Sequence, residues 1–419
     1  MYYDLTEAER VELEETLGKG LCPPIPQNVW DDRITRCRQL MAQHGLDALL
    51  VYAGGQVLTG RDWARYFANY KEPLWNAESF IFIPLQGDLC FIVNYPHMVP
   101  LIRQSSPITD VRAYAHLGSF DRYAELVPIL RDIVRERGVG AGRIGLGRHG
   151  MQGDFLPSVL DRSLTKALDG AAVEDASTLL WDLTAQKSDY DVEMIRRSNA
   201  ILCDGVEAIY RALGEGRKEH EYYAAFWEAV CDRGAEVDEM AACHVDSQSA
   251  PGSEIPNKPF SVTLRRLRKG DVLMIDPGVT YRGYVSDIAR TAVIGPPSAD
   301  LRKMFDATAA GNDAMVEILR PGVTVSQLSE MYFTTIEKHG FRREQSHVLQ
   351  GHGIGFMKNE PPLISQWAPN LVIRKGMTIS VETALMQPGL TRARVEDTYL
   401  VTDGAPLKLT PAPHDLYVV

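Results

Sequence analysis

The chain has 419 residues, of which 45% are hydrophobic and 24% are charged, the composition of an ordinary soluble globular protein. This length exceeds the size at which one hydrophobic core usually stops growing, so we expect two domains. The net charge of −11 disfavours nucleic acid as a partner, because phosphate binding needs a basic surface.

The opening segment, MYYDLTEAERVELEE, is acidic and lacks the basic start and apolar core of a signal peptide. No run of 18 apolar residues occurs, so we expect no membrane span and no membrane partner. The six cysteines are scattered without a C-x-x-C pair, which predicts reduced thiols and a cytoplasmic location. They are Cys22, Cys37, Cys90, Cys203, Cys231 and Cys243.

Residues 1–180 alternate between helix and strand patterns, which predicts an α/β domain. After an N-terminal arm at 1–25, residues 31–47 have apolar side chains at helical spacing that end near Gly45. Apolar strands are expected at 48–54 and within 79–94, the latter interrupted by a hairpin signal at 86–88. A helix at 122–138 and a short buried strand at 143–147 follow.

Residues 181–419 begin with a long helical pattern at 188–216, whose start is rich in charge. Further helices are expected at 219–234, 299–319 and 325–340. A loop rich in Ser, Pro and Gly is expected at 245–261, before an apolar strand at 271–276. The sequence from 377 onward indicates mostly strands.

Four carboxylates and one imidazole in this second domain together predict one metal site. They are Asp276, Asp287, His352, Glu382 and Glu396. The carboxylates lie in or beside apolar strand patterns, where a charge is costly unless it is paired or metal-bound. The eleven-residue spacing of Asp276 and Asp287 fits two neighbouring antiparallel strands joined by a turn at 279–283, and glycines on both sides of His352 indicate close backbone approach. Such ligands suit a pair of Mn²⁺, Fe²⁺, Co²⁺ or Zn²⁺ ions bridged by water, with Mn²⁺ preferred because carboxylates predominate.

Each of these residues also has an explanation that needs no metal. Asp287 would pair with Arg290, Glu396 would pair with Arg394, and His352 would be a hydrogen-bonded core histidine. We favour the metal site because four separate carboxylates in apolar surroundings are hard to explain as solvated surface.

The sequence resembles the pita-bread metallohydrolases, the family of aminopeptidase P, prolidase, methionine aminopeptidase and the metal-free creatinase. The segments DPGVTYRGYVSDIART, GHGIG, ISVET and RVED occur in the family's order, and AQKSDYDVEMIRRSNAI is similar to the segment that opens its catalytic domain. The resemblance implies an α/β fold with a creatinase-like domain at 1–180 and a pita-bread domain at 181–419. It also implies a homodimer and a hydrolase similar to Xaa-Pro aminopeptidases and dipeptidases.

The resemblance further implies a role for each ligand. Asp276 and Asp287 would bind one ion, His352 and Glu382 would bind the other, and Asp287 and Glu396 would bridge the two. Glu382 would also act as general base on the bridging water.

Two more residues are expected to support these ligands. By the resemblance, Arg394 would hold the carboxylates in place, and we expect Tyr284 to pack beneath the metals.

The chain departs from the peptidase pattern at two histidines near the metals. The peptidases carry one of them seven residues after His352, in a V-H-E-P-P context, where this chain reads MKNEPP with Asn359. The other precedes the first metal strand, and Asn257 in IPNKPF is the nearest match. Asparagine forms hydrogen bonds to a carbonyl or carboxylate but cannot pass a proton as histidine does.

Three functions follow from this departure. In the first, the protein is a hydrolase that cleaves an amide-like C–N bond of a short peptide or small molecule. Asn257 and Asn359 would then orient the substrate. A proton would come from Lys358, Glu360 or His244. In the second, a lyase similar to the family's dimethylsulfoniopropionate lyase uses Lys358 or Glu360 to remove a proton from carbon in a small zwitterion. In the third, a binding or scaffold protein keeps a relict site, which the intact ligands argue against. We favour the hydrolase.

Two other features have alternative explanations. His347 either faces the pocket or caps a local turn. The aromatic cluster Trp63, Tyr66, Phe67, Tyr70 and Trp75 either fills the core or covers a dimer partner's active site, where it would hold a cationic or apolar group. No strand–GxGxxG–helix unit, nucleophile elbow or P-loop occurs, so dinucleotide-binding, serine hydrolase and NTPase sites are not expected.

Overall fold

The structure is a computed structural model. It describes residues 25–54, 62–70, 78–115, 123–147, 149–150, 153–154, 158–168, 170–236, 244–248, 264–387 and 391–419. The chain divides into two compact units, Met1–Thr184 and Ala185–Val419. Within the described ranges, no helix has both the length and the apolar character needed to span a bilayer.

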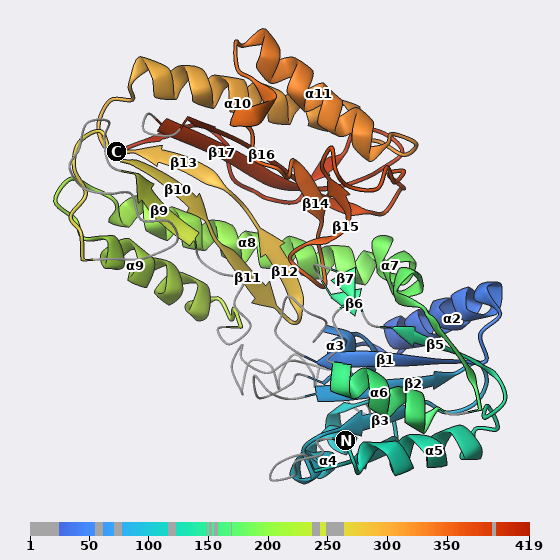
Figure 1. Ribbon diagram of the computed structural model, residues 1–419. Helices are drawn as coiled ribbons and strands as arrows, with labels where there is room; N and C mark the ends of the chain where they lie inside the picture. The colour runs from blue at the N-terminus through green and yellow to red at the C-terminus, as the bar shows by residue number, and fades with distance from the viewer. Residues whose placement is uncertain are drawn as a thin grey trace. The chain divides into compact units, whose positions relative to one another are not determined.

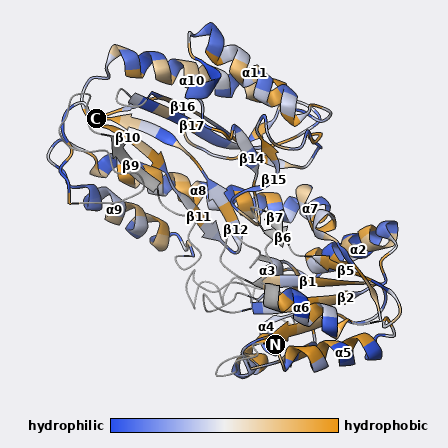
Figure 2. Cartoon of the chain, viewed as in Figure 1, coloured by the Kyte–Doolittle hydropathy of each residue, from blue (hydrophilic) through white to orange (hydrophobic). Residues whose placement is uncertain are grey.

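The first unit is built on a mixed six-stranded sheet (Figure 1). Its strands are β1 (Ala48–Gly54), β2 (Glu78–Pro84), β3 (Cys90–Val93), β4 (Asp110–Ala113), β5 (Arg143–Gly147) and β8 (Ala172–Asp175), in the order β4-β3-β2-β1-β5-β8. β1 pairs antiparallel with β2 and parallel with β5. The central strands β1 and β2 are apolar along most of their length, as Figure 2 shows, because both of their faces are buried.

Helices accompany this sheet in the expected α/β alternation. They are α2 (Gln27–His44), α3 (Asp62–Ala68), α4 (Val99–Ser105), α5 (Leu126–Glu136), α6 (Ser158–Ala167) and α7 (Ser177–Ala185), with a 3₁₀ turn η2 (Pro96–Met98) and the short strands β6 (His149–Gly150) and β7 (Gly153–Asp154). The predicted stop of the first helix is confirmed, because Gly45 follows α2 with a φ of 67°. The four described cysteines are free thiols, and Cys231 is exposed.

Part of the aromatic segment forms the short helix α3. Trp63, Tyr66 and Phe67 lie on α3 and are at most 2% exposed. The rings of Trp63 and Tyr66 meet edge to face with their centroids 5.8 Å apart. The described members of the aromatic cluster therefore fill the core of this unit, and Trp75 lies outside the described residues.

The second unit places two pairs of helices beside its strands (Figure 1). The helices are α8 (Asp189–Ala212), α9 (Glu219–Asp232), α10 (Ala299–Ile318) and α11 (Val325–Lys338), with a 3₁₀ turn η3 (Arg343–Gln345). α8 starts where the sequence predicts, because Ser188 and Asp191 form a reciprocal capping box.

The strands of this unit form two larger sheets and a hairpin. They are β9 (His244–Gln248), β10 (Val272–Asp276), β11 (Gly278–Tyr281), β12 (Tyr284–Asp287), β13 (Arg290–Val293), β14 (Gly351–Gly353), β15 (Glu360–Ile364), β16 (Thr378–Gln387), β17 (Thr391–Leu400), β18 (Leu407–Lys408) and β19 (Tyr417–Val418). The sheet orders are β19-β13-β10-β9 and β15-β14-β16-β17-β18, and β11 pairs with β12.

Each helix pair is fixed to its strands by polar as well as apolar contacts. Ser198 of α8 donates to the carbonyl of Val279 in β11 at 3.2 Å. Asn312 of α10 donates to the carbonyls of Val381 and Val395, on neighbouring strands, at 2.9 and 3.3 Å. These bonds satisfy buried groups and fix the register of helix against sheet.

Three details differ from the sequence prediction. The loop expected at 245–261 begins as strand β9, because its backbone pairs antiparallel with β10, a tertiary partner that local composition does not reveal. The turn expected at 279–283 is only two residues long, since Arg282 and Gly283 have φ values of 51° and 80° and link Tyr281 directly to Tyr284. The expected pairing of the strands that carry Asp276 and Asp287 was wrong, because β12 pairs with β11, whereas β10 pairs with β9 and β13.

A buried ion pair connects β13, β17 and the C-terminal segment. Arg290 Nη2 lies 2.7 Å from Asp397 Oδ1, and the two side chains are 1% and 0% exposed. Arg290 also donates to the carbonyls of Glu396 and Pro413. Burial alone would raise the pKa of Asp397, but His414, Arg290 and Lys408 hold it at about 2.

We predict that Asp397→Asn lowers the free energy of unfolding by about 3–5 kcal/mol, because Arg290 keeps its charge in a buried site without its charged partner. Urea denaturation in the presence of a chelator measures this without a contribution from metal binding. The control Asp403→Asn removes an exposed ion pair with Lys375 and should cost less than about 1 kcal/mol. Equal losses of unfolding free energy in the two variants would contradict a stabilising role for the buried Arg290–Asp397 pair.

Candidate metal centre

The hairpin β11–β12 and the strand before it deliver the first two carboxylates. Asp276 ends β10, and Pro277 interrupts the strand before β11 begins. Asp287 ends β12, directly opposite Gly278. Both carboxylates are buried, at 3% and 1% exposure.

His352 is positioned by an unusually close approach of backbone. It lies opposite Ser380 in the pairing of β14 with β16. A Cβ atom at Gly351 would lie 2.4 Å from the carbonyl oxygen of Ser380, and one at Gly353 would lie 2.6 Å from that of Pro361. The close approach predicted from the flanking glycines is confirmed, since no larger residue fits at either position.

Glu382 and Glu396 come from the long antiparallel pair β16–β17. They are directly opposite each other, so their side chains leave the same face of the sheet side by side. Both are buried. Two adjacent buried carboxylates repel each other unless positive charge lies between or beside them.

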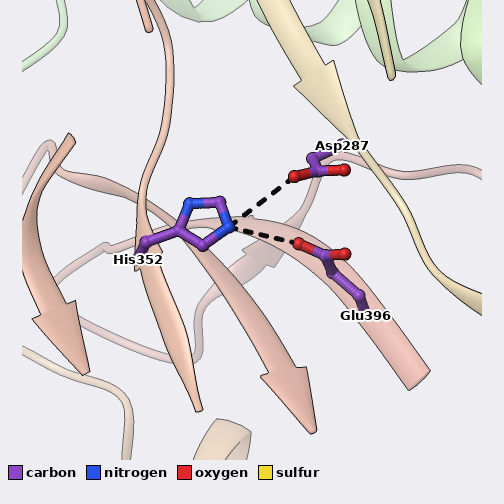
Figure 3. A group of neighbouring side chains, drawn as sticks. All are labelled: Asp287, His352 and Glu396. Carbon is purple, nitrogen blue, oxygen red and sulfur yellow. Dashed lines mark ion pairs between the residues drawn. The ribbon is translucent and has the colours of Figure 1, made fainter. Parts of the chain in front are cut away.

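The imidazole of His352 is the point where Asp287, Glu382 and Glu396 meet, and Figure 3 shows it with Asp287 and Glu396. Its Nε2 lies 3.4 Å from Glu396, 3.6 Å from Asp287 and 3.6 Å from Glu382. Its Nδ1 is 3.0 Å from the carbonyl oxygen of Gly353, which accepts a hydrogen bond from the Nδ1–H group. In the neutral imidazole this bond keeps the proton on Nδ1 and leaves the lone pair of Nε2 on the side of the carboxylates, the arrangement that metal-binding histidines use.

Two side-chain cations also reach the carboxylates. Arg394 Nη1 lies 2.7 Å from Asp276 Oδ2, and its Nη2 contacts Glu382 Oε1. Lys358 Nζ lies 3.1 Å from Asp287 Oδ1 and 3.8 Å from Asp276 Oδ1. The explanation without a metal fails at both proposed pairs, because Arg290 binds Asp397 rather than Asp287 and the closest partners of Arg394 are Asp276 and Glu382.

The electrostatics show that these cations do not balance the site. Burial, together with the neighbouring Glu396, raises the pKa of Asp287 to about 7. Burial would lower the pKa of His352, but Glu396 and Asp287 raise it overall. The cluster therefore takes up protons in place of missing positive charge, which a divalent cation would displace.

The donor atoms fit such a cation. One ligand atom each from Asp287, His352 and Glu396 lies within 4.8 Å of the others. Two donor atoms bound tetrahedrally to one ion at about 2.1 Å are roughly 3.4 Å apart. The distances from His352 Nε2 to the nearest oxygens of Asp287, Glu382 and Glu396 are 3.4 to 3.6 Å, close to this value. Glu396 Oε1 accepts a bond from Ser380 at 2.6 Å, whereas its buried Oε2 has no hydrogen-bond partner among the described residues.

The loop after His352 holds two further predicted residues. Asn359 is half-buried, and its Oδ1 has no hydrogen-bond partner among the described residues. Glu360 is not available to move a proton. Its Oε1 accepts bonds from the backbone of Phe356 and Met357, and its Oε2 lies 2.5 Å from Lys187 Nζ. Glu360 thus fixes the loop, a function that its place beside Asn359 in the sequence does not reveal.

The remaining candidates are placed as follows. Tyr284 donates to Asp191 at 2.6 Å, so its hydroxyl connects β12 to α8. The backbone of His244 lies opposite Asp276. His347 Nδ1 is 3.2 Å from the carbonyl of Leu349, a local turn contact, and burial and Arg394 lower its pKa. Asn257 lies outside the described residues.

Comparisons with known proteins identify the family of the chain. The model of metallopeptidase family M24 matches residues 193–403, and that of the creatinase/prolidase N-terminal domain matches residues 33–183. A protein named Xaa-Pro dipeptidase from Pyrococcus horikoshii is 29% identical over 62% of this chain and 72% of its own length. A probable dipeptidase PepE from Mycobacterium bovis is 32% identical over 64% of this chain and 69% of its own length.

Solved structures extend the likeness over nearly the whole chain. Dipeptidase PepE from Mycobacterium ulcerans has a TM-score of 0.77 at 25% identity, covering 94% of this chain and 99% of the other. An X-Pro aminopeptidase from Thermotoga maritima has the same TM-score of 0.77 at 21% identity, with 92% and 99% covered. The expected fold, a creatinase-type α/β domain followed by a pita-bread α/β domain, is confirmed. The chain belongs to metallopeptidase family M24.

Proposed function

We propose that this protein is a divalent-metal-dependent hydrolase that cleaves the C–N bond of Xaa-Pro dipeptides or similar short peptides. The convergence of three buried carboxylates on His352 Nε2 is the observation that carries this proposal. The family membership and the dipeptidase names of its relatives support the same reaction class.

Asp287, His352, Glu382 and Glu396 would hold the metal. A divalent ion bound there supplies a Lewis acid for the substrate carbonyl and lowers the pKa of water. Glu382 takes the proton from the attacking water, since one of its oxygens faces His352 while Arg394 orients the other. Arg394 and Ser380 keep these carboxylates fixed during the reaction.

Asn359 and Asn257 are proposed to stand where the peptidases of this family carry histidines. The unbonded Oδ1 of Asn359 would accept a hydrogen bond from a substrate N–H or ammonium group. Because asparagine cannot carry a proton, another group must protonate the leaving amine. His244 is the candidate for this role, since its backbone lies opposite Asp276.

Three finer features belong to the same proposal. Mn²⁺ is the preferred metal because oxygen ligands predominate. The protein is proposed to be a homodimer and cytoplasmic. Light scattering during gel filtration tests the homodimer, and a monomer at micromolar concentration would refute it.

We predict that the Mn²⁺-loaded protein releases proline from an Xaa-Pro dipeptide and that Glu382→Gln lowers kcat by about 100-fold or more, because the general base is lost. The control Glu344→Gln changes an exposed glutamate and should leave kcat unchanged. If no Xaa-Pro peptide is cleaved at any pH, the peptidase proposal is wrong. Formation of an alkene product from a small zwitterion would then establish the lyase alternative.

For Asn359→Ala we predict an approximately tenfold higher KM for the dipeptide, equivalent to the loss of about 1.4 kcal/mol of substrate binding. The melting temperature should not fall, because the Oδ1 atom has no protein partner to lose among the described residues. Asn370→Ala, which removes a cap on Ser326 at the protein surface, serves as the control for KM. An unchanged KM for Asn359→Ala would show that its amide does not contact substrate.

A further inference from the structure

The carboxylate oxygens of the centre divide into two groups according to what they face. One oxygen each of Asp287, Glu382 and Glu396 faces His352 Nε2 at 3.4 to 3.6 Å. The other oxygens of Asp287 and Glu382 face Lys358 and Arg394 instead. The protein's own cations therefore occupy one side of the cluster, and His352 occupies the other.

Asp276 lies wholly on the side of the cations. Its Oδ2 is 2.7 Å from Arg394, and its Oδ1 is 3.8 Å from Lys358. Lys358 Nζ sits between Asp276 and Asp287, at 3.1 Å from the latter. A carboxylate whose two oxygens both face side-chain cations has little remaining affinity for a metal ion, because the ion would be repelled by the same charges.

Charge balance leads to the same result. The four carboxylates contribute four negative charges, and Lys358 and Arg394 contribute two positive charges. One divalent ion makes this buried cluster neutral, whereas two would leave an excess positive charge that is costly away from water. Lys358 is only 17% exposed, so solvent screens its charge weakly.

We propose that Lys358 takes the place of a second metal ion, so that the centre binds one divalent cation, held by Asp287, His352, Glu382 and Glu396. The Lys358 ammonium offsets part of the negative charge of Asp276 and Asp287 from a fixed position between them. This inference rests on the proposed metal-dependent function but makes a separate claim, since a hydrolase with two ions would have the same activity class.

The test is the number of Mn²⁺ ions bound per chain, measured by elemental analysis after equilibrium dialysis at a series of free Mn²⁺ concentrations. We expect one ion for the wild-type chain and two for Lys358→Met, which removes the ammonium but keeps a side chain of similar length. Lys358→Arg keeps the charge and should bind one. Lys375→Met removes an exposed lysine on the same unit and should also bind one.

The possible outcomes separate the two proposals. Two ions in the wild-type chain at similar affinity would overturn the role of Lys358 and leave the metal-dependent function intact. One ion in both the wild type and a folded Lys358→Met would also overturn it. No ion in any variant would refute the proposed function itself. If Lys358→Met does not fold, the wild-type and Lys358→Arg values still decide, because two ions in either contradict the proposal.

Discussion

The second unit of this protein is organised around an excess of buried negative charge. Asp276, Asp287, Glu382 and Glu396 are each at most 3% exposed, and the last three lie within 3.6 Å of one imidazole nitrogen. Burial of like charges at such distances is tolerated only when cations enter the cluster, so the site requires positive charge in order to fold with its carboxylates ionised. The raised pKa of Asp287, about 7, expresses this requirement in the absence of an ion.

The architecture of the unit supplies that cluster from strands that are distant in sequence. The paired strands β16 and β17 set Glu382 and Glu396 side by side, and the glycines around His352 let β14 approach closely enough to bring the imidazole between them and Asp287. The ion pair of Glu360 with the buried Lys187 fixes the loop that follows. That loop carries Lys358 into the cluster, and the rigid surroundings allow a few side chains to be held at the separations that one metal ion needs.

Much of the fold follows from local patterns, because helix periodicity, the Ser188 cap and apolar strands are local properties of the sequence. The convergence of the carboxylates was predictable too, since a charge in an apolar strand demands a partner. Strand β9 was not, because it depends on pairing with β10, which is distant in sequence. The direction of the Lys358 side chain was not either, because it depends on how Glu360 holds the loop backbone. From the sequence, Glu360 and Lys358 were equally good candidates for a proton carrier. In the structure Glu360 holds the loop backbone and Lys187, whereas Lys358 contacts the carboxylates.

Anomalous diffraction at the manganese absorption edge, from crystals grown with Mn²⁺, tests the central claim most directly. The account predicts one strong peak per chain, about 2.1 Å from His352 Nε2 and in contact with Asp287 and Glu396, with the Lys358 ammonium still between Asp276 and Asp287. Two peaks of similar height, with Lys358 displaced from the carboxylates, would contradict the single-ion centre. An absence of any peak near His352 would contradict the metal site as a whole.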